Sequence, residues 1–130
     1  MESKRGVPEE ARQVLAALSG VRVRQAAPEE AELHAAVAEA LAAAGLEARH
    51  EAVLGPRCRV DFLCGTVGIE IKKGAPPLAR LREQCARYLR SDRLSALIVV
   101  SPRALRVPGV IAGKPVVVFS LNRLWGVALP

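Results

Sequence analysis

The sequence predicts an α/β domain in which helices flank a mixed central β-sheet. Three observations support this prediction: three short strand patterns follow one another with only tight turns between them, a helical pattern comes next, and two apolar strand patterns follow it. Strands joined by tight turns pair antiparallel, whereas strands joined through a helix pair parallel, so the sheet should be mixed. With 130 residues, of which 51% are hydrophobic, the chain can bury the core of one such domain.

The N-terminal part begins with a short helical pattern. Pro8 lies at its start, acidic residues occupy its first turn, and Ser19-Gly20 ends it. The alternating residues 21–24 are typical of a short basic strand. We therefore expect residues 1–27 to form a helical and basic appendage to a domain that spans residues 28–130.

Glycine and proline delimit the other elements. A second helix is expected from Pro28 to about Ala44, because Gly45 is a typical residue to end it. The hairpin strands, the crossover helix and the two apolar strands are then expected at residues 48–54, 57–64, 67–73, 78–90, 96–100 and 116–121.

Two of these strands form a hairpin whose register follows from its turn. Gly65-Thr66 fits a two-residue type II′ turn, which pairs Cys64 with Val67. Counting back along both strands places Asp61 opposite Glu70. Directly opposed residues have Cβ atoms about 5 Å apart, so two negative charges at this position should repel each other.

The hairpin also carries the candidate catalytic residues. Strand alternation places Val60 and Phe62 on one face and Asp61 on the other. A divalent cation would remove the repulsion between Asp61 and Glu70, because hard cations such as Mg²⁺ bind carboxylate oxygens. Lys72 points to the same side as Glu70 and could hold an attacking water or a phosphate. The alternative is a solvent-facing hairpin whose Glu–Lys pair is only a surface salt bridge.

The helix before the hairpin supplies a further candidate. At about 100° per residue, Glu30 falls on the same stripe as the apolar residues Leu33, Val37 and Leu41. A carboxylate on a core-facing stripe would suit a metal site. It would also suit a helix N-terminus, where the dipole favours acids. His34 faces the same way, and we interpret it as a semi-buried histidine with satisfied hydrogen bonds and not as a ligand.

The helix after the hairpin carries Gln84 and Tyr88 one turn apart. This pair could hydrogen-bond a phosphate or a neighbouring side chain, although ordinary interface polarity explains it equally well. Basic side chains on this helix and on the hairpin suit a phosphate backbone, with a solvated surface as the alternative. The candidate substrate contacts of this kind are Arg59, Lys73, Arg80 and Arg87.

The net charge of +6 favours polyanionic partners, such as nucleic acid or an anionic membrane. Only 3% of the residues are aromatic, so a platform on which bases stack is not expected. Contacts to a nucleic acid should therefore be made mainly to its phosphates.

The cysteine pattern and the hydropathy indicate the compartment. The chain has an odd number of cysteines, namely Cys58, Cys64 and Cys85, and no CxxC pair. We therefore expect buried free thiols and not disulfides or a metal cluster. No stretch reaches the roughly 20 apolar residues of a membrane span, and the N-terminus lacks the apolar segment of a signal peptide. We expect a cytoplasmic, intracellular protein without membrane association.

Four elements occur in an order that resembles the PD-(D/E)XK nuclease superfamily. The Gln-x-x-x-Tyr element is similar to that of RecB-like exonucleases, and the Glu-x-x-Leu element is similar to the start of archaeal Holliday-junction resolvases. The resemblance covers residues 28–101. The elements are Glu30-x-x-Leu33, Arg59-Val60-Asp61-Phe62, Ile69-Glu70-Ile71-Lys72 and Gln84-x-x-x-Tyr88.

The resemblance implies a restriction-endonuclease-like core that hydrolyses DNA phosphodiester bonds with Mg²⁺ or Mn²⁺. Asp61, Glu70 and the carbonyl of Ile71 would bind the metal, and Glu30 would complete the shell directly or through water. Lys72 would position or activate the water.

Other implications of the resemblance concern the substrate and assembly. Gln84 and Tyr88 would support the substrate or the active-site lysine. No proline precedes Asp61, and the cysteines of iron–sulfur exonucleases are absent, so no cluster and no small-molecule cofactor are expected. Endonuclease or exonuclease action in DNA repair or recombination would follow. The small size suggests a homodimer.

Two alternatives to a DNA nuclease remain at this point. The first is a catalytically inactive or partner-dependent nucleic-acid-binding module on the same fold. The second is a structural α/β protein with a charged hairpin. The second alternative predicts no metal binding and no loss of function in Asp61→Ala.

Overall fold

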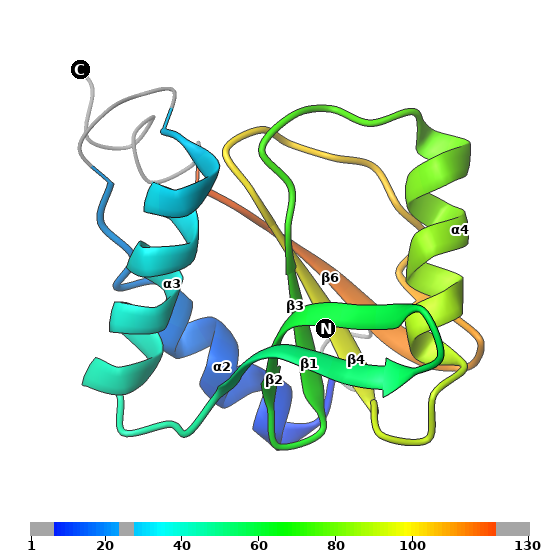
Figure 1. The fold of residues 1–130 in the computed structure, drawn as a ribbon, viewed down its shortest axis with the longest axis horizontal. Coiled ribbons are helices and arrows are strands. Elements are labelled where there is room, and N and C mark those ends of the chain that lie inside the picture. The colour runs from blue at the N-terminus through cyan, green and yellow to red at the C-terminus, as the bar shows by residue number, and fades with distance from the viewer. Residues whose placement is uncertain (1–6, 24–27, 122–130) are drawn as a thin grey trace.

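The computed structural model describes residues 7–23 and 28–121 of the chain (Figure 1). These residues form three helices and six strands. In chain order they are α2 (Glu9–Leu18), α3 (Glu30–Ala43), β1 (Arg49–Gly55), β2 (Cys58–Cys64), β3 (Val67–Ile71), α4 (Leu78–Leu89), β4 (Ala96–Ser101), β5 (Val110–Ile111) and β6 (Lys114–Ser120).

The strands form one mixed sheet in the order β1-β2-β3-β4-β6-β5. Successive pairs among β1, β2 and β3 are antiparallel, β3, β4 and β6 are parallel, and β5 is antiparallel to β6. The predicted α/β class with a mixed sheet is therefore confirmed. The sequence analysis missed β5, because a strand of two residues has too few positions to show an alternating pattern.

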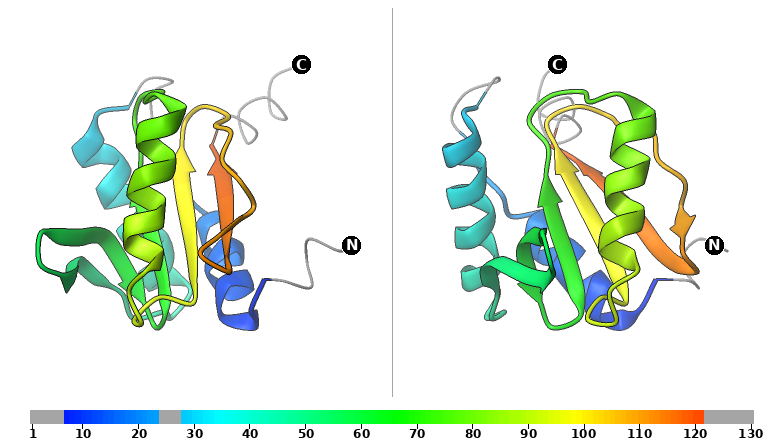
Figure 2. Two further views of the ribbon diagram at one scale, coloured as in Figure 1. Left: turned by 90° about the vertical axis from the view of Figure 1, so that its right-hand side faces the viewer. Right: turned by 45° about the vertical axis from the view of Figure 1, so that its right-hand side comes forward.

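Helices cover both faces of the sheet (Figures 1 and 2): α2 and α3 lie against one face, and α4 lies against the other. Strand β4 is completely buried between these layers, which explains its uninterrupted apolar sequence. Ile98 and Val100 face α2 and α3, while Leu97 and Val99 face α4. None of the helices in the described part of the chain is both long and apolar enough to cross a membrane.

Helix α2 is an integral part of the core, although we expected residues 1–27 to form an appendage. Ala11, Val14 and Leu18 are almost fully buried and lie on one helical stripe that packs on the sheet and on α3. Residues 21–23 are not in a strand, contrary to the alternation predicted for residues 21–24, of which the last lies outside the described residues. The apolar residues Val14 and Leu18 follow Ala11 at spacings of three and seven residues, and this helical periodicity in the sequence indicates the packing.

The turn between β2 and β3 has the expected form. Gly65 has a φ of 63°, and the register Cys64↔Val67 follows, as the type II′ turn predicts. Glu10 of α2 accepts a hydrogen bond from the main-chain N of Thr66 (3.3 Å). A Cβ atom at Gly65 would displace the Glu10 carboxylate, and the positive φ at this position favours glycine in any case.

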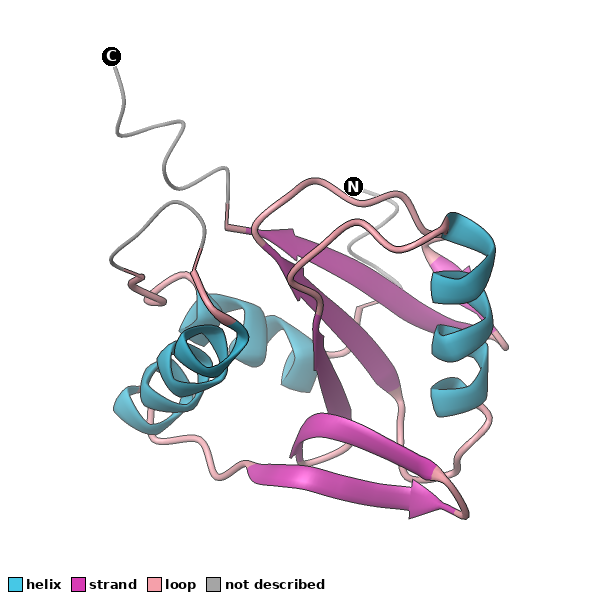
Figure 3. Cartoon of the chain, turned by 45° about the horizontal axis from the view of Figure 1, so that its top comes forward, coloured by secondary structure: helices cyan, strands magenta, loops and turns pink. Residues whose placement is uncertain are grey.

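Alternate residues of strand β2 do not all pack against the same helical layer. Val60 packs in the cluster beneath α4, whereas Phe62 packs in the cluster beneath α2 and α3. The expectation that both share a face is therefore wrong. The alternation is interrupted at Asp61, opposite Glu51 of β1, whose φ of 54° departs from strand geometry. Figure 3 shows the outer part of the β1–β2 hairpin turning away from β3. The pairing of β2 with β3 extends only to Phe62↔Ile69.

The three cysteines are free and buried, as predicted. Burial raises the pKa of the Cys64 and Cys85 thiols, so both are poor nucleophiles. They act as small apolar residues of the two core clusters. The C-terminal segment with Trp125 lies outside the described residues.

Candidate active site

Asp61 and Glu70 lie where β2 and β3 separate, one position beyond the last paired residues. Asp61 Oδ2 accepts a hydrogen bond from the main-chain N of Ile71 (2.8 Å). In turn, Glu70 Oε1 accepts one from the main-chain N of Asp61 (3.2 Å). Each carboxylate thus accepts a hydrogen bond from a main-chain N–H of the other strand. In a continued β2–β3 pairing, main-chain carbonyl groups would accept such bonds.

Glu70 is the buried member of the pair, with only 7% of its surface exposed. Burial and the neighbouring charge of Asp61 raise the pKa of Glu70 to about 7, although Lys72 opposes this shift. Lys72 Nζ lies 3.5 Å from Glu70 Oε2, and its side chain is 22% exposed. The ammonium group therefore reaches both the buried carboxylate and the solvent. This burial is incompatible with a solvent-facing Glu–Lys pair.

Gln84 and Tyr88 of α4 form a wall behind Glu70. Gln84 Nε2 lies 3.5 Å from Glu70 Oε2 and donates a hydrogen bond to the Tyr88 hydroxyl (3.0 Å). Tyr88 is 4% exposed, and burial raises the pKa of its hydroxyl, with a further contribution from Glu70. The hydroxyl therefore stays protonated and can donate to the carboxylate.

His34 of α3 approaches the pair from the other side. Its Nε2 lies 3.8 Å from Asp61 Oδ2 and 3.6 Å from Glu30 Oε2. Its Nδ1 shares a hydrogen bond of 3.2 Å with His50 Nε2. The His50 ring stacks on Phe62, and the His34 ring is tilted toward it. We expected His34 to be fully satisfied. Within the described residues, however, its buried Nε2 has no hydrogen-bond partner.

Glu30 does not face the core as the helical stripe predicted. Its side chain is 70% exposed, because it is the first residue of α3 and the buried stripe begins one turn later, at Leu33. Glu30 reaches the site only through His34, at the rim of an apolar cavity of about 780 Å³ along α3. A role beside the carboxylates would therefore require movement of its side chain or a bridging water.

The candidate substrate contacts are dispersed around this centre. Lys73 Nζ pairs with Glu29 Oε1 (3.3 Å), and Arg59 Nη1 pairs with Glu51 Oε1 (3.3 Å). Arg80 and Arg87 are exposed on α4.

Two residues that contact or surround the site residues were not predicted: His50, which contacts His34, and Arg57, which lines a cavity with Gln84 and Tyr88. His50 was missed because its partner His34 is distant in the chain, and Arg57 because it was treated only as the start of a strand. Arg57 has a φ of 54° at the tip of the β1–β2 hairpin, and a basic residue after Gly55-Pro56 was the one available signal.

The donor set was tested against a divalent metal. Within residues 7–23 and 28–121, no group of three or more His, Cys, Asp or Glu side chains has an arrangement that could hold an ion. Asp61 and Glu70 nevertheless offer hard carboxylate oxygens, and the adjacent Ile71 carbonyl is a donor of the same class. Mg²⁺ usually keeps several waters and takes one or two carboxylates from the protein. Burial and the repulsion from Asp61 both raise the pKa of Glu70, so an added cation would be favoured at the pair, and these donors fit such an ion.

Comparison with known proteins found no matching family model, no matching curated protein and no matching solved structure. The function must therefore be inferred from the chemistry of the site itself.

Proposed function

We propose that the protein is a Mg²⁺- or Mn²⁺-dependent deoxyribonuclease with a PD-(D/E)XK active site. The observation that carries the proposal is the convergence of Asp61, Glu70 and Lys72 at the point where β2 and β3 separate. A mutually repelling carboxylate pair with one buried member is costly to the fold unless a cation or a proton compensates it. Such a pair beside a lysine suits phosphodiester hydrolysis.

The fold supports the proposal of a restriction-endonuclease-like core. The antiparallel strands β1, β2 and β3 are followed by a crossover through α4 to the parallel strand β4. Helices α3 and α4 flank the site from opposite faces of the sheet. This is the arrangement that the resemblance of residues 28–101 implies.

Each residue has a part in the proposed mechanism. Asp61, Glu70 and the Ile71 carbonyl would hold the ion, which when bound supplies charge neutralisation at the phosphate and lowers the pKa of water. Lys72 would orient the attacking water or a phosphate oxygen through its partly exposed ammonium group. Gln84 and Tyr88 would position the Glu70 carboxylate.

Cleavage assays test the proposal. Linear, circular and branched DNA and single-stranded RNA would be incubated with Mg²⁺, Mn²⁺ or EDTA. Metal-dependent cleavage of DNA by the wild type and its loss in Asp61→Asn are expected. Arg12→Ala, which removes an exposed charge on α2, is the control that should remain active. Circular substrate separates endonuclease from exonuclease action.

The opposite outcome is equally informative. If no DNA is cleaved with either metal, although the protein is folded, the nuclease proposal is wrong. A nucleic-acid-binding module without catalytic activity would then be the better description. Cleavage that persists unchanged in Asp61→Asn would place the chemistry elsewhere.

A further inference from the structure

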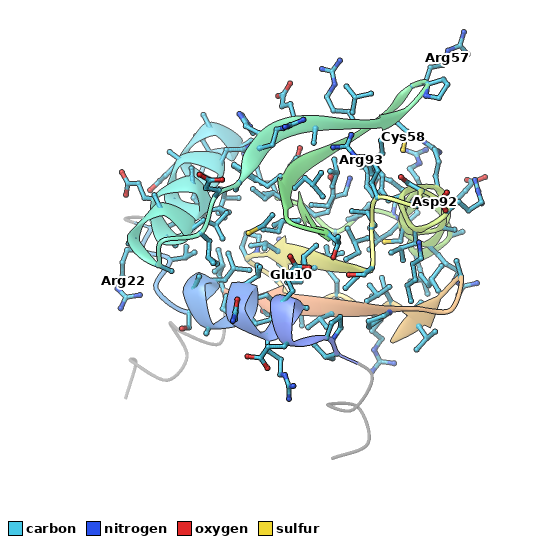
Figure 4. All side chains as sticks on the ribbon, turned by 90° about the horizontal axis from the view of Figure 1, so that it is seen from below. Glu10, Arg22, Arg57, Cys58, Asp92 and Arg93 are labelled. Carbon is cyan, nitrogen blue, oxygen red and sulfur yellow. The ribbon has the colours of Figure 1, made fainter. Side chains whose placement is uncertain are left out.

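A second cavity lies between the tip of the β1–β2 hairpin and α4. Its volume is about 380 Å³. Figure 4 shows Arg57 and Cys58 at this tip, above α4, with Arg22 at the opposite end of the molecule. The cavity is lined by Val53, Gly55, Arg57, Cys58, Arg59, Gln84, Arg87 and Tyr88.

The cavity is strongly positive. Three of its lining residues are arginines, and none is acidic. Glu51 offsets Arg59 in part, through their 3.3 Å ion pair, whereas no ion pair is found for Arg57 or Arg87 within the described residues. The same field acts on Cys58 at the cavity wall: burial raises the pKa of this thiol, but Arg87 and Arg90 act to lower it.

Arg57 occupies a backbone conformation that is unfavourable for its residue type. Its φ of 54° is in the left-handed region, where glycine or asparagine is accommodated more easily. The hairpin tip therefore carries a guanidinium group at a conformational cost. Glu51 and Ala112 have similar φ values (54° and 55°), so the argument for a role of Arg57 rests on its place in the cavity lining.

The cavity is next to the candidate active site, because two residues of α4 contribute to both. Gln84 and Tyr88 line the cavity, and both also hold Glu70. An anion bound by the arginines would therefore lie one layer of side chains away from the carboxylate pair. Guanidinium groups bind phosphate oxygens in pairs of hydrogen bonds, which makes arginine well suited to this task.

We propose that this cavity, with Arg57, Arg59 and Arg87, is a subsite that binds a phosphate group of the DNA strand next to the scissile one. The choice of DNA rests on the proposed function, but the phosphate chemistry follows from the cavity itself. Tyr88 is the only aromatic residue in the lining and is buried, so the subsite reads the backbone and not a base.

Metal-free binding tests the subsite without requiring catalysis. The affinity for single-stranded and duplex DNA would be measured by fluorescence anisotropy in EDTA at several salt concentrations. The test variant is the double substitution Arg57→Asn and Arg87→Ala; asparagine tolerates the left-handed conformation, so the hairpin should still fold. The matched control is Arg12→Ala with Arg22→Ala, which removes the same charge from exposed positions. Arg12 lies on α2, across the sheet from α4, and Figure 4 shows Arg22 at the opposite end of the molecule.

The expected result is a loss of affinity of about tenfold in the cavity variant and little change in the control. The magnitude of the slope of log K against log salt should also fall by about 1 to 2 in the cavity variant. Each phosphate contact that is lost means that fewer counterions are released on binding. Equal losses in both variants would overturn the subsite, because they would indicate only a general effect of net charge.

A second measurement needs no substitution. Inorganic phosphate would be titrated while the side-chain Nε–Hε resonances of the arginines are followed by NMR. Saturable shifts confined to Arg57, Arg59 and Arg87 support the subsite, and uniform shifts that include Arg12 and Arg22 overturn it. Both measurements can succeed even if the protein cleaves nothing, so failure of the subsite and failure of the nuclease proposal are distinguishable.

The source of the phosphate is resolved by the choice of DNA. Linear strands with a 5′-phosphate, a 3′-phosphate or no terminal phosphate would be compared with a circular strand. Equal arginine-dependent binding of all four assigns the subsite to internal phosphodiesters. A preference for one phosphorylated end assigns it to a terminal phosphate, as an exonuclease would require.

Discussion

The side chains of Asp61 and Glu70 each accept a hydrogen bond from a main-chain N–H of the other's strand. The main-chain N of Ile71 donates to Asp61, and the main-chain N of Asp61 donates to Glu70. Both carboxylates therefore support the sheet and also form the centre of the candidate active site. Amide substitutions are the appropriate test at these positions, because asparagine and glutamine keep an oxygen that accepts the main-chain hydrogen bond.

We predict that Mg²⁺ stabilises the folded protein through this pair. A ligand that binds only the folded state at one hundred times its Kd adds about 2.7 kcal/mol. The melting temperature of the wild type should therefore rise between EDTA and saturating Mg²⁺. Asp61→Asn should show little of this rise, since it loses a carboxylate and keeps the hydrogen bond. Equal responses of the two proteins would contradict the metal assignment.

The stability of the metal-free protein should fall as the pH rises. Burial and Asp61 raise the pKa of Glu70 from its ordinary value of 4.5 to about 7. Between these two values the folded state holds the proton more tightly than the unfolded chain, so stability is lost over this window and stays low above it. The loss is about 3 kcal/mol at most.

Urea unfolding of wild type and Glu70→Gln in EDTA measures this effect. The variant cannot ionise at this position, so it should gain stability relative to the wild type between pH 5 and pH 8. The single variant Lys72→Gln should lose more stability than the wild type as the pH rises. In the wild type, the charge of Lys72 opposes the rise in the pKa of Glu70. A difference between wild type and Glu70→Gln that does not vary with pH would show that Glu70 does not titrate in this range.

Lys72 should be needed for cleavage and not for metal binding. Its ammonium group lies 3.5 Å from Glu70 and reaches solvent, where substrate would arrive. We expect Lys72→Gln to lower the cleavage rate by about 100-fold or more, the range of a positioned acid–base or electrostatic group. The rise in melting temperature with Mg²⁺ should persist. A variant that loses both properties would indicate that Lys72 maintains the site's structure.

Helix α2 should contribute directly to stability. Leu18 is completely buried against the sheet and α3, and Leu→Ala changes at such positions cost about 2 to 5 kcal/mol. Leu78→Ala is the matched control, because Leu78 is 45% exposed and should cost less than about 1 kcal/mol. Chemical denaturation of both variants makes the comparison. Similar small losses would restore the view that the N-terminal region is an appendage.

Local signals accounted for most of the fold that the sequence predicted. The Gly65-Thr66 turn determined the hairpin register, and the apolar runs and the glycine and proline positions located the five longer strands and the helices to within one or two residues. Asp61 and Glu70 could be placed together because a two-residue turn and strand pairing act over short distances.

Contacts between distant segments could be decided only by the tertiary structure. Packing on the sheet makes α2 part of the core, and the start of α3 leaves Glu30 in solvent. The interrupted alternation at Asp61 places Val60 and Phe62 in different layers. The His34–His50 contact and the arginine cavity between the β1–β2 hairpin and α4 likewise join residues far apart in the chain. The sequence by itself thus determined the helices, the five longer strands and the hairpin register that brings Asp61 and Glu70 together, but neither β5 nor the absence of a strand at residues 21–23. The tertiary structure decided what surrounds them, because burial and electrostatic environment depend on how all the layers pack together.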